Sequence, residues 1–268
     1  MGVRDAGWIM LFAETNQEAY DNYLMAMRIA ESVDLPIMIC QDGFITSHAI
    51  ENIELVETDK VKAFVGERDA EHYLLKKGET LHVGAYATPV YYMEAKRAQA
   101  QAMIDAKDSI IKISNEFAEM TGRQYGLIEE YMMEDAEEAL IIIGSSAGTA
   151  KETIAALRAE GKKVGLVKIR AFRPFPGKEI VEAIKNCKAV AVMDKDDSFN
   201  GHCGPMYAEV CAAMIANGIT APKTIDIIYG LGGRDVKVES IKKVYAMLDE
   251  IIATGELGET YRYLEVRG

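Results

Sequence analysis

The chain has 268 residues, 49% of them apolar and 27% charged, which is enough for one large domain or two ordinary ones with a buried core. Its formal net charge of -12 argues against nucleic acid as a partner, because phosphate binding requires clustered Lys and Arg. No apolar run approaches the roughly 18 residues of a membrane span, and the first residues lack the pattern of a signal peptide. We therefore expect a cytoplasmic protein that binds neither nucleic acid nor a membrane.

Four cysteines, Cys40, Cys187, Cys203 and Cys211, occur without any C-x-x-C pair. That spacing disfavours zinc and excludes an iron–sulfur cluster held by closely spaced thiolates. We expect reduced, mostly buried thiols and no metal site in this chain. If the protein takes part in redox chemistry, its electrons must travel through another chain.

Residues 1–58 show the order strand, helix, strand. Thr15 and Glu18 have the spacing of a capping box, which satisfies backbone donors where a helix begins. The apolar strand "LPIMIC" then ends in the polar turn "QDGFITSH". Two strands make only half of a parallel α/β unit, so we expect this sheet to be completed by strands from outside the chain.

Residues 59–135 predict a connector built around one long helix that lies along the body of the protein. Pro89 suits its start and Gly122 its end. The second half of the helix carries the apolar stripe that should be buried, at Met103, Ile104, Ile110, Ile111 and Phe117.

Residues 136–268 alternate regularly between apolar strands and helices. The strands "ALIIIG", "VGLVKI", "AVAVMD" and "TIDIIYG" are continuous apolar runs, which is typical of a parallel sheet covered on both faces. Pro205 stands at the favoured first position of the helix that follows the third strand.

Open parallel sheets bind ligands at the carboxyl ends of their strands. The loops there include "GSSAGT" and "YGLGGRD", but neither has the spacing of a phosphate loop or of the dinucleotide fingerprint, and tight turns explain their glycines. Arg170, Arg173 and Arg234 could bind an anion or form salt bridges to a partner subunit, and the sequence leaves their role open. Arg4, just before the first strand, could bind a substrate carboxylate or could pair with Asp5 at the surface.

Several segments closely resemble the alpha subunit of multi-subunit pyruvate:ferredoxin oxidoreductase, within the 2-oxoacid:ferredoxin oxidoreductase family. They include "VRDAGWIMLFAETNQEAYDN", "LPIMICQDGFITSHAIENIE", "YYMEAKRAQAQAMIDAK", "KIRAFRPFP" and "VMDKDDSFNGHCGP". The resemblance implies an α/β fold: the C-terminal part of a thiamine pyrimidine-binding domain at 1–58, a connector with a long helix at 59–135, and a parallel-sheet transketolase C-terminal-like domain at 136–268. It also implies that this chain lacks the N-terminal part of the pyrimidine-binding domain.

The same resemblance implies a thiamine diphosphate-dependent enzyme that converts pyruvate oxidatively to acetyl-CoA and CO₂, with electrons passing to ferredoxin. Thiamine diphosphate and Mg would be held mainly by other chain segments, because the expected G-D-G and N-N motif is not in this sequence. The iron–sulfur clusters would lie on a partner subunit. The expected partners are beta, gamma and delta-type subunits, with ferredoxin and coenzyme A reached through the complex, and the isolated chain should be inactive.

For the site, the resemblance carries over two substrate-binding residues and no catalytic one. Arg4 matches the arginine that contacts the substrate carboxylate, and Asp5 would orient it. Oxalate or another 2-oxoacid stays open as the substrate. A non-catalytic scaffold protein derived from the family is an alternative of another class, and a transketolase-type component that uses no ferredoxin is a third.

Overall fold

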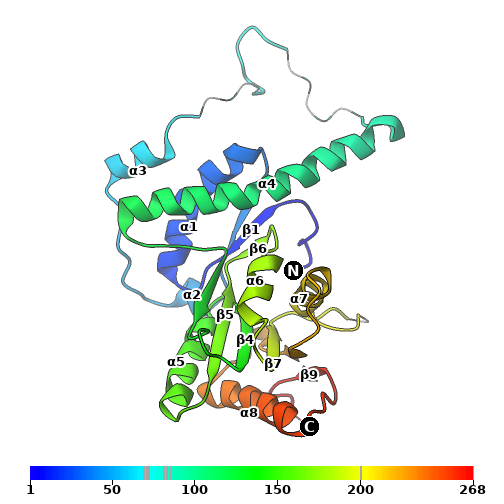
Figure 1. Cartoon of the computed structure of the whole chain (residues 1–268). Helices are drawn as coiled ribbons and strands as arrows, with labels where there is room; N and C mark the ends of the chain where they lie inside the picture. Colours follow the sequence, from blue (N-terminus) through cyan, green and yellow to red (C-terminus); the bar gives the residue numbers. More distant parts are fainter. Residues whose placement is uncertain are drawn as a thin grey trace.

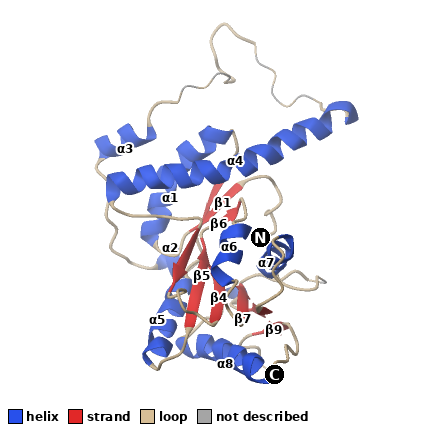
Figure 2. Ribbon diagram, viewed as in Figure 1, coloured by secondary structure: helices blue, strands red, loops and turns tan. Residues whose placement is uncertain are grey.

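The computed structural model describes residues 1–68, 70, 73–80, 82, 84, 86–199 and 201–267. Its described part contains a three-stranded and a six-stranded sheet, with helices packed against both (Figures 1 and 2). The long helix α4 (Pro89–Thr121) lies across the smaller sheet, and its first half projects beyond the body of the molecule. None of the described helices combines the length and apolar character that crossing a bilayer would demand.

The smaller sheet has the strand order β2-β1-β6. Strands β1 (Ile9–Phe12) and β2 (Ile37–Cys40) are parallel and are joined by helix α1 (Asn16–Val33). Strand β6 (Ala171–Arg173) comes from the second half of the chain and pairs antiparallel with β1. The expectation that this sheet is completed only from outside the chain is therefore wrong for one of its two edges.

Helix α1 begins as its sequence predicts. The amide of Glu18 donates to the Thr15 hydroxyl at 3.1 Å, as in a capping box. The Glu18 carboxylate accepts from the amide of Glu14 at 2.7 Å and not from that of Thr15, so the reciprocal bond is shifted by one residue. This places the Glu18 carboxylate beside the end of β1.

Two short helices, α2 (Ile45–His48) and α3 (Thr58–Val65), follow β2. Helix α4 then ends at Gly122 in a left-handed conformation, as predicted. Its buried residues include Ala106, Ile110, Ile113 and Phe117, which pack with α1 and β1 in one apolar cluster. The predicted stripe is thus confirmed at Ile110 and Phe117, and Met103 is partly buried against the same cluster, whereas Ile104 and Ile111 are exposed and were predicted wrongly.

The larger sheet has the order β3-β5-β4-β7-β8-β9. Its central strands β4 (Glu138–Ile143), β5 (Val164–Ile169), β7 (Ala189–Asp194) and β8 (Lys223–Ile228) are parallel, as their continuous apolar runs predict. Strand β9 (Tyr261–Tyr263) adds parallel to β8, whereas β3 (Ile128–Tyr131) is antiparallel to β5.

Helices cover both faces of this sheet, which explains why β4, β5 and β7 are buried from end to end. One apolar cluster joins it to α5 (Ser146–Ala159) and α8 (Val238–Thr254). The other joins it to α6 (Gly177–Ile184) and α7 (Pro205–Ala216), with Pro205 at the start of α7 as predicted. A 3-10 turn, η1 (Leu231–Gly233), lies after β8.

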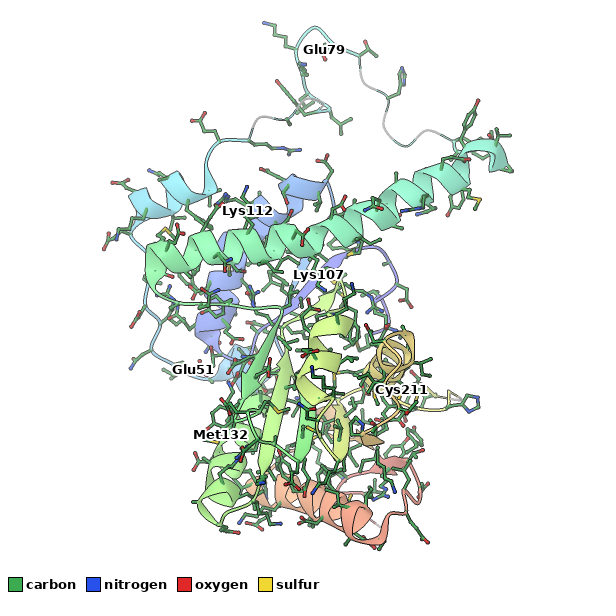
Figure 3. The ribbon with its side chains drawn as sticks, in the orientation of Figure 1. Glu51, Glu79, Lys107, Lys112, Met132 and Cys211 are labelled. Atoms are coloured by element: carbon green, nitrogen blue, oxygen red, sulfur yellow. The ribbon has the colours of Figure 1, made fainter. Side chains whose placement is uncertain are left out.

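The two sheets are tied together by more than β6. Met10 of β1 packs in the apolar cluster of the larger sheet. Lys107, labelled on α4 in Figure 3, forms an ion pair with Glu179 of α6 at 2.7 Å. These contacts hold the two sheets together, and β1, β2, β4 and β7 end beside one cavity.

Candidate functional site

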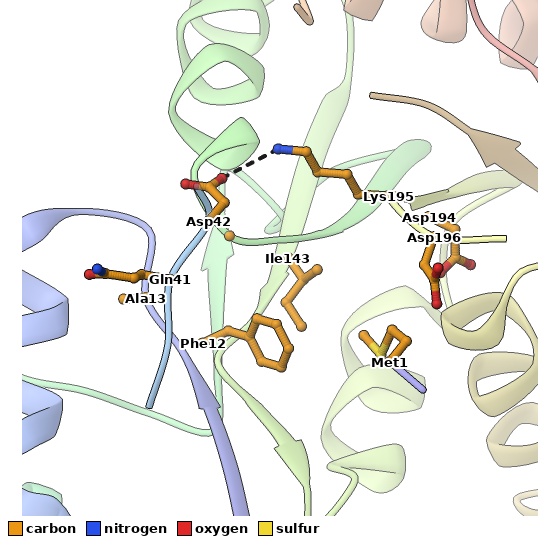
Figure 4. Close-up of a pocket in the computed structure, with 10 residues that line it drawn as sticks. Met1, Phe12, Ala13, Gln41, Asp42, Ile143, Asp194, Lys195 and Asp196 are labelled. Atoms are coloured by element: carbon orange, nitrogen blue, oxygen red, sulfur yellow. Dashed lines mark hydrogen bonds and ion pairs between the residues drawn. The ribbon is translucent and has the colours of Figure 1, made fainter. Parts of the chain in front are cut away.

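A cavity of about 240 Å³ lies where the carboxyl ends of β1, β2, β4 and β7 meet. Such a meeting point of parallel strands is where ligands bind in open α/β sheets. Its apolar wall includes Phe12, Ile143 and Met1, and its polar wall includes Asp42, Asp194, Lys195 and Asp196 (Figure 4).

Asp42 follows strand β2 and is held in its ionised form. It accepts hydrogen bonds from the Thr46 hydroxyl at 2.7 Å and the Thr46 amide at 3.2 Å, and from the Ser145 hydroxyl. Lys195 Nζ lies 3.5 Å from its carboxylate. Burial acts to raise the pKa of Asp42, but the hydrogen bonds from Ser145 and Thr46 outweigh it and hold this pKa below its usual value.

Asp194, at the end of β7, has the opposite character. Burial raises its pKa to about 7, although the amides of Met206 and Tyr207 donate to it at 3.0 and 2.9 Å and act against this rise. Its carboxylate crosses to the N-terminus of α7 and leaves no room for a side chain at Gly204, whose Cβ would lie 2.5 Å from Asp194 Oδ2. Asp194 can therefore gain or lose a proton near neutral pH at the wall of the cavity.

Asp226 on β8 holds the same loop from the neighbouring strand. It accepts from the Gly204 amide at 2.5 Å, and burial raises its pKa to about 6. Together Asp194 and Asp226 hold the start of α7 in place, through the amides of Gly204, Met206 and Tyr207. The polar loops "QDGFITSH" and "KDDSFNGHCGP" were the sequence signal for this wall, but the prediction singled out none of their acidic residues.

Arg4 and Asp5 lie together in a turn that precedes β1. The amide of Arg4 donates to the carbonyl of Met1 at 2.9 Å, and Met1 lines the cavity, so the turn borders it. Arg4 Nε is 3.7 Å from the Asp5 carboxylate, and the Arg4 side chain is 31% exposed. Neither residue is among those that line the cavity itself, and the substrate-binding role of both stays a prediction.

The three arginines whose role the sequence left open have different surroundings. Arg170 is buried and donates to Asn22 Oδ1 at 2.5 and 3.0 Å and to the Gly126 carbonyl at 3.1 Å. Burial lowers its pKa to about 10. Arg173 contacts the turn of Arg4 and Asp5, and Arg234 donates to the carbonyl of Glu265.

Glu14, Glu18 and Glu129 bring their carboxylates close enough to hold a metal ion. The ammonium of Lys168 occupies that place, at 2.6 Å from Glu14, 2.6 Å from Glu18 and 2.5 Å from Glu129. Burial acts to lower the pKa of Lys168, but the carboxylates of Glu18 and Glu14 outweigh it and raise this pKa. This group is therefore a charge network around the buried Lys168 ammonium that joins α1 to the larger sheet.

The described residues around the cavity do not fit a diphosphate. Asp42 and Asp196 line the cavity against a single ammonium, that of Lys195, while the Asp194 carboxyl is turned to the amides of α7, so the lining offers a diphosphate anion little positive charge.

Two family models match the chain. The first, described as pyruvate flavodoxin/ferredoxin oxidoreductase, thiamine diP-bdg, covers residues 1–115. The second, described as pyruvate:ferredoxin oxidoreductase core domain II, covers residues 136–241.

Curated proteins show the same relationship. The pyruvate synthase subunit PorA of Thermotoga maritima is 41% identical over 100% of this chain and 67% of that protein. PorA of Methanocaldococcus jannaschii is 39% identical over 90% of the chain, which spans only 62% of that relative. The ketoisovalerate oxidoreductase subunit VorA of Pyrococcus horikoshii is 37% identical over 98% of the chain and 67% of that protein.

Among solved structures, the 2-oxoglutarate:ferredoxin oxidoreductase of Magnetococcus marinus matches with a TM-score of 0.58. The match covers 91% of this chain and 42% of that one at 16% identity, which shows a shared fold.

Proposed function

Because the chain belongs to the 2-oxoacid:ferredoxin oxidoreductase family, as a relative of its PorA and VorA alpha subunits, we propose that it acts as the alpha-type subunit of such an enzyme. The observation that carries the proposal is the match to PorA along the entire chain at 41% identity. Pyruvate is the first candidate substrate. A branched 2-oxoacid is the second, because VorA subunits match nearly as well.

The proposed reaction consumes a 2-oxoacid, coenzyme A and two oxidised one-electron carriers. It yields an acyl-CoA, CO₂, a proton and two reduced carriers, with ferredoxin as the carrier. Thiamine diphosphate, when bound, would supply the carbanion stabilisation that loss of CO₂ from a 2-oxoacid requires. The acidic cavity supports placing the diphosphate on other chain segments, and the lack of the G-D-G and N-N motif supports placing its Mg there too; we assign no step through the cofactor to this chain.

Within that enzyme, the contribution of this chain is to bind the substrate and to contact other subunits. The Arg4 guanidinium would bind the carboxylate of the 2-oxoacid, and Asp5 would orient it. The partly exposed side chain of Arg4, in a turn beside the cavity, supports this role. The division into a pyrimidine-binding part at 1–58, a connector at 59–135 and a transketolase C-terminal-like domain at 136–268 belongs to the same proposal.

The assembly would include beta, gamma and delta-type subunits, with the iron–sulfur clusters on a partner chain. The four cysteines of this chain are free thiols, three of them only partly buried, which suits a cytoplasmic location.

Purification of the native assembly through a tag on this chain tests the proposal. We expect co-purification of chains that bind thiamine diphosphate and iron–sulfur clusters, and coenzyme A-dependent reduction of ferredoxin by pyruvate or a branched 2-oxoacid. A stable, colourless homomer that binds no thiamine diphosphate would contradict it and favour a scaffold protein. An active assembly without iron would favour a transketolase-type component.

In the assembled enzyme, Arg4→Ala should raise the KM for the 2-oxoacid. A hydrogen bond to a charged group contributes about 1.5–3 kcal/mol, which corresponds to roughly 10- to 100-fold in KM. An unchanged KM would remove Arg4 from the substrate site.

A further inference from the structure

Arg173 joins the larger sheet to the turn that carries Arg4 and Asp5. It ends strand β6 and lies opposite Met10 of β1 in the antiparallel pair. Its side chain is only 13% exposed, and its guanidinium carbon lies 4.7 Å from the ring centroid of Phe172. Packing and pairing therefore hold Arg173 in one orientation beside the turn.

The guanidinium of Arg173 makes contacts in three directions. Nε donates to the carbonyl oxygen of Arg4 at 3.0 Å, and Nη1 donates to the carbonyl of Phe172 at 3.0 Å. Nη2 donates to two carboxylates, that of Asp5 at 3.2 Å and that of Glu209 on α7 at 2.5 Å. One cation thus fixes both the backbone of Arg4 and the side chain of its neighbour.

The turn is also closed by its own backbone. The amide of Arg4 donates to Met1 at 2.9 Å, and the amide of Ala6 donates to Val3 at 3.0 Å. Among the described residues, the one carboxylate within ion-pair distance of the Arg4 guanidinium is that of Asp5, at 3.7 Å. A fixed backbone that carries a weakly paired cation can bind an anion with little loss of conformational entropy.

Asp5 is shared between the two arginines and lies nearer to Arg173, at 3.2 Å, than to Arg4, at 3.7 Å. At 3.7 Å the Asp5 carboxylate can orient the Arg4 guanidinium without occupying it, but if Arg173 were removed, Asp5 would be free to form a closer pair with Arg4. Such a pair would occupy the guanidinium edge that a substrate carboxylate needs. Arg173 therefore holds the competing carboxylate away from Arg4.

We propose that Arg173 is a positioning residue for substrate binding: it fixes the turn of Arg4 and holds Asp5 aside, so that the Arg4 guanidinium is available to the carboxylate of a 2-oxoacid. Glu209 anchors Arg173 from the side of α7. The inference rests on the proposed function, since it requires that Arg4 binds the substrate.

Steady-state kinetics of the assembled enzyme test this role. Arg173→Met should raise the KM for the 2-oxoacid roughly tenfold, a usual cost of losing a residue that orients a ligand-binding group, with kcat changed by less than about twofold. Combined with Arg4→Ala, it should raise KM no further than Arg4→Ala alone, because Arg173 acts only through Arg4. Asp5→Asn should restore part of the affinity of Arg173→Met, because the amide cannot neutralise Arg4.

Arg262→Met is the matched control. Arg262 also donates to two backbone carbonyls, those of Glu259 and Leu257, but lies on β9, so KM should not change. Subunit composition and melting temperature show whether each variant assembles. If Arg173→Met does not assemble, Arg173→Lys is measured instead; it keeps the charge but loses the contact to the Arg4 carbonyl, and KM should still rise.

Three outcomes separate the possibilities. A raised KM for Arg4→Ala with an unchanged KM for an assembled Arg173 variant would overturn the inference and leave the proposed function intact. Multiplicative effects in the double variant would also overturn it, because Arg173 would then act independently of Arg4. An unchanged KM for Arg4→Ala would refute the substrate contact in the proposed function itself.

Discussion

Lys168→Met should be among the most destabilising single changes in this chain. The Lys168 side chain is 3% exposed and its ammonium lies within 2.6 Å of Glu14, Glu18 and Glu129, while Lys151 alone would remain to compensate them. Removing one partner of a buried ion pair typically costs about 3–5 kcal/mol, because the other charge stays buried, and here Glu18 would be left with no lysine within ion-pair distance among the described residues. We expect a loss in that range in the free energy of unfolding at neutral pH, from urea denaturation of the full chain.

The pH dependence gives this prediction a second test. The raised pKa of Lys168 means that its stabilising contribution is complete below the unfolded value of about 10.5 and is lost only as pH rises through the folded pKa. Burial acts to raise the pKa of Glu129, but hydrogen bonds from Lys151 and Lys168 outweigh it and lower this pKa. The stabilisation from Glu129 is therefore complete above the unfolded pKa of about 4.5 and is lost as pH falls through the lowered folded pKa. The deficit of Lys168→Met should therefore be largest near neutral pH and shrink in acid.

Lys163→Met is the matched control, because Lys163 pairs with Glu137 at 3.1 Å but is 55% exposed. An exposed pair contributes about 0–1 kcal/mol. A loss of the same small size for both variants would refute the argument that Lys168 compensates a buried carboxylate cluster.

The other predictions concern the loop that borders the cavity. Gly204→Ala places a Cβ 2.5 Å from the Asp194 carboxylate and should lower the free energy of unfolding by about 1–3 kcal/mol, measured by the urea midpoint; an unchanged midpoint would show that the loop can move aside. The pKa of Asp194, raised by burial to about 7 from 3.8, means that the folded state binds its proton more tightly, so stability should fall as pH rises from about 4 to 7. In Asp194→Asn, the free energy of unfolding from urea titrations should depend less on pH between about 4 and 7. The same pH dependence in the variant and in the unchanged chain would contradict the raised pKa of Asp194.

Local signals in the sequence predicted the individual elements well. Gly122 ends the long helix, Pro205 begins α7, and Thr15 caps α1, because each effect depends on backbone chemistry within a few residues. Ile104 and Ile111 were wrongly included in the buried stripe of α4 because apolar residues occur on two sides of that helix. Only the packing against α1 decides that Ile113 is buried and Ile104 is exposed.

The long-range contacts could not be predicted in this way. The first sheet was expected to be completed from outside the chain, yet Ala171–Arg173 forms a strand on β1, about 160 residues earlier in the chain. The contact of Arg173 with Arg4 arises from this pairing, and no local pattern encodes it. Asp42 and Asp194 likewise become neighbours of one cavity only because strands from two sheets end together.

A structure of the assembled enzyme with a bound, unreactive 2-oxoacid analogue tests the central claim most directly, through the distance between the Arg4 guanidinium and the ligand. The account predicts a substrate carboxylate oxygen at about 2.7–2.9 Å from an Arg4 nitrogen, with the Arg173 contact to the Arg4 carbonyl kept. A bound 2-oxoacid whose carboxylate contacts other residues, with the Arg4 guanidinium turned toward solvent, would contradict it.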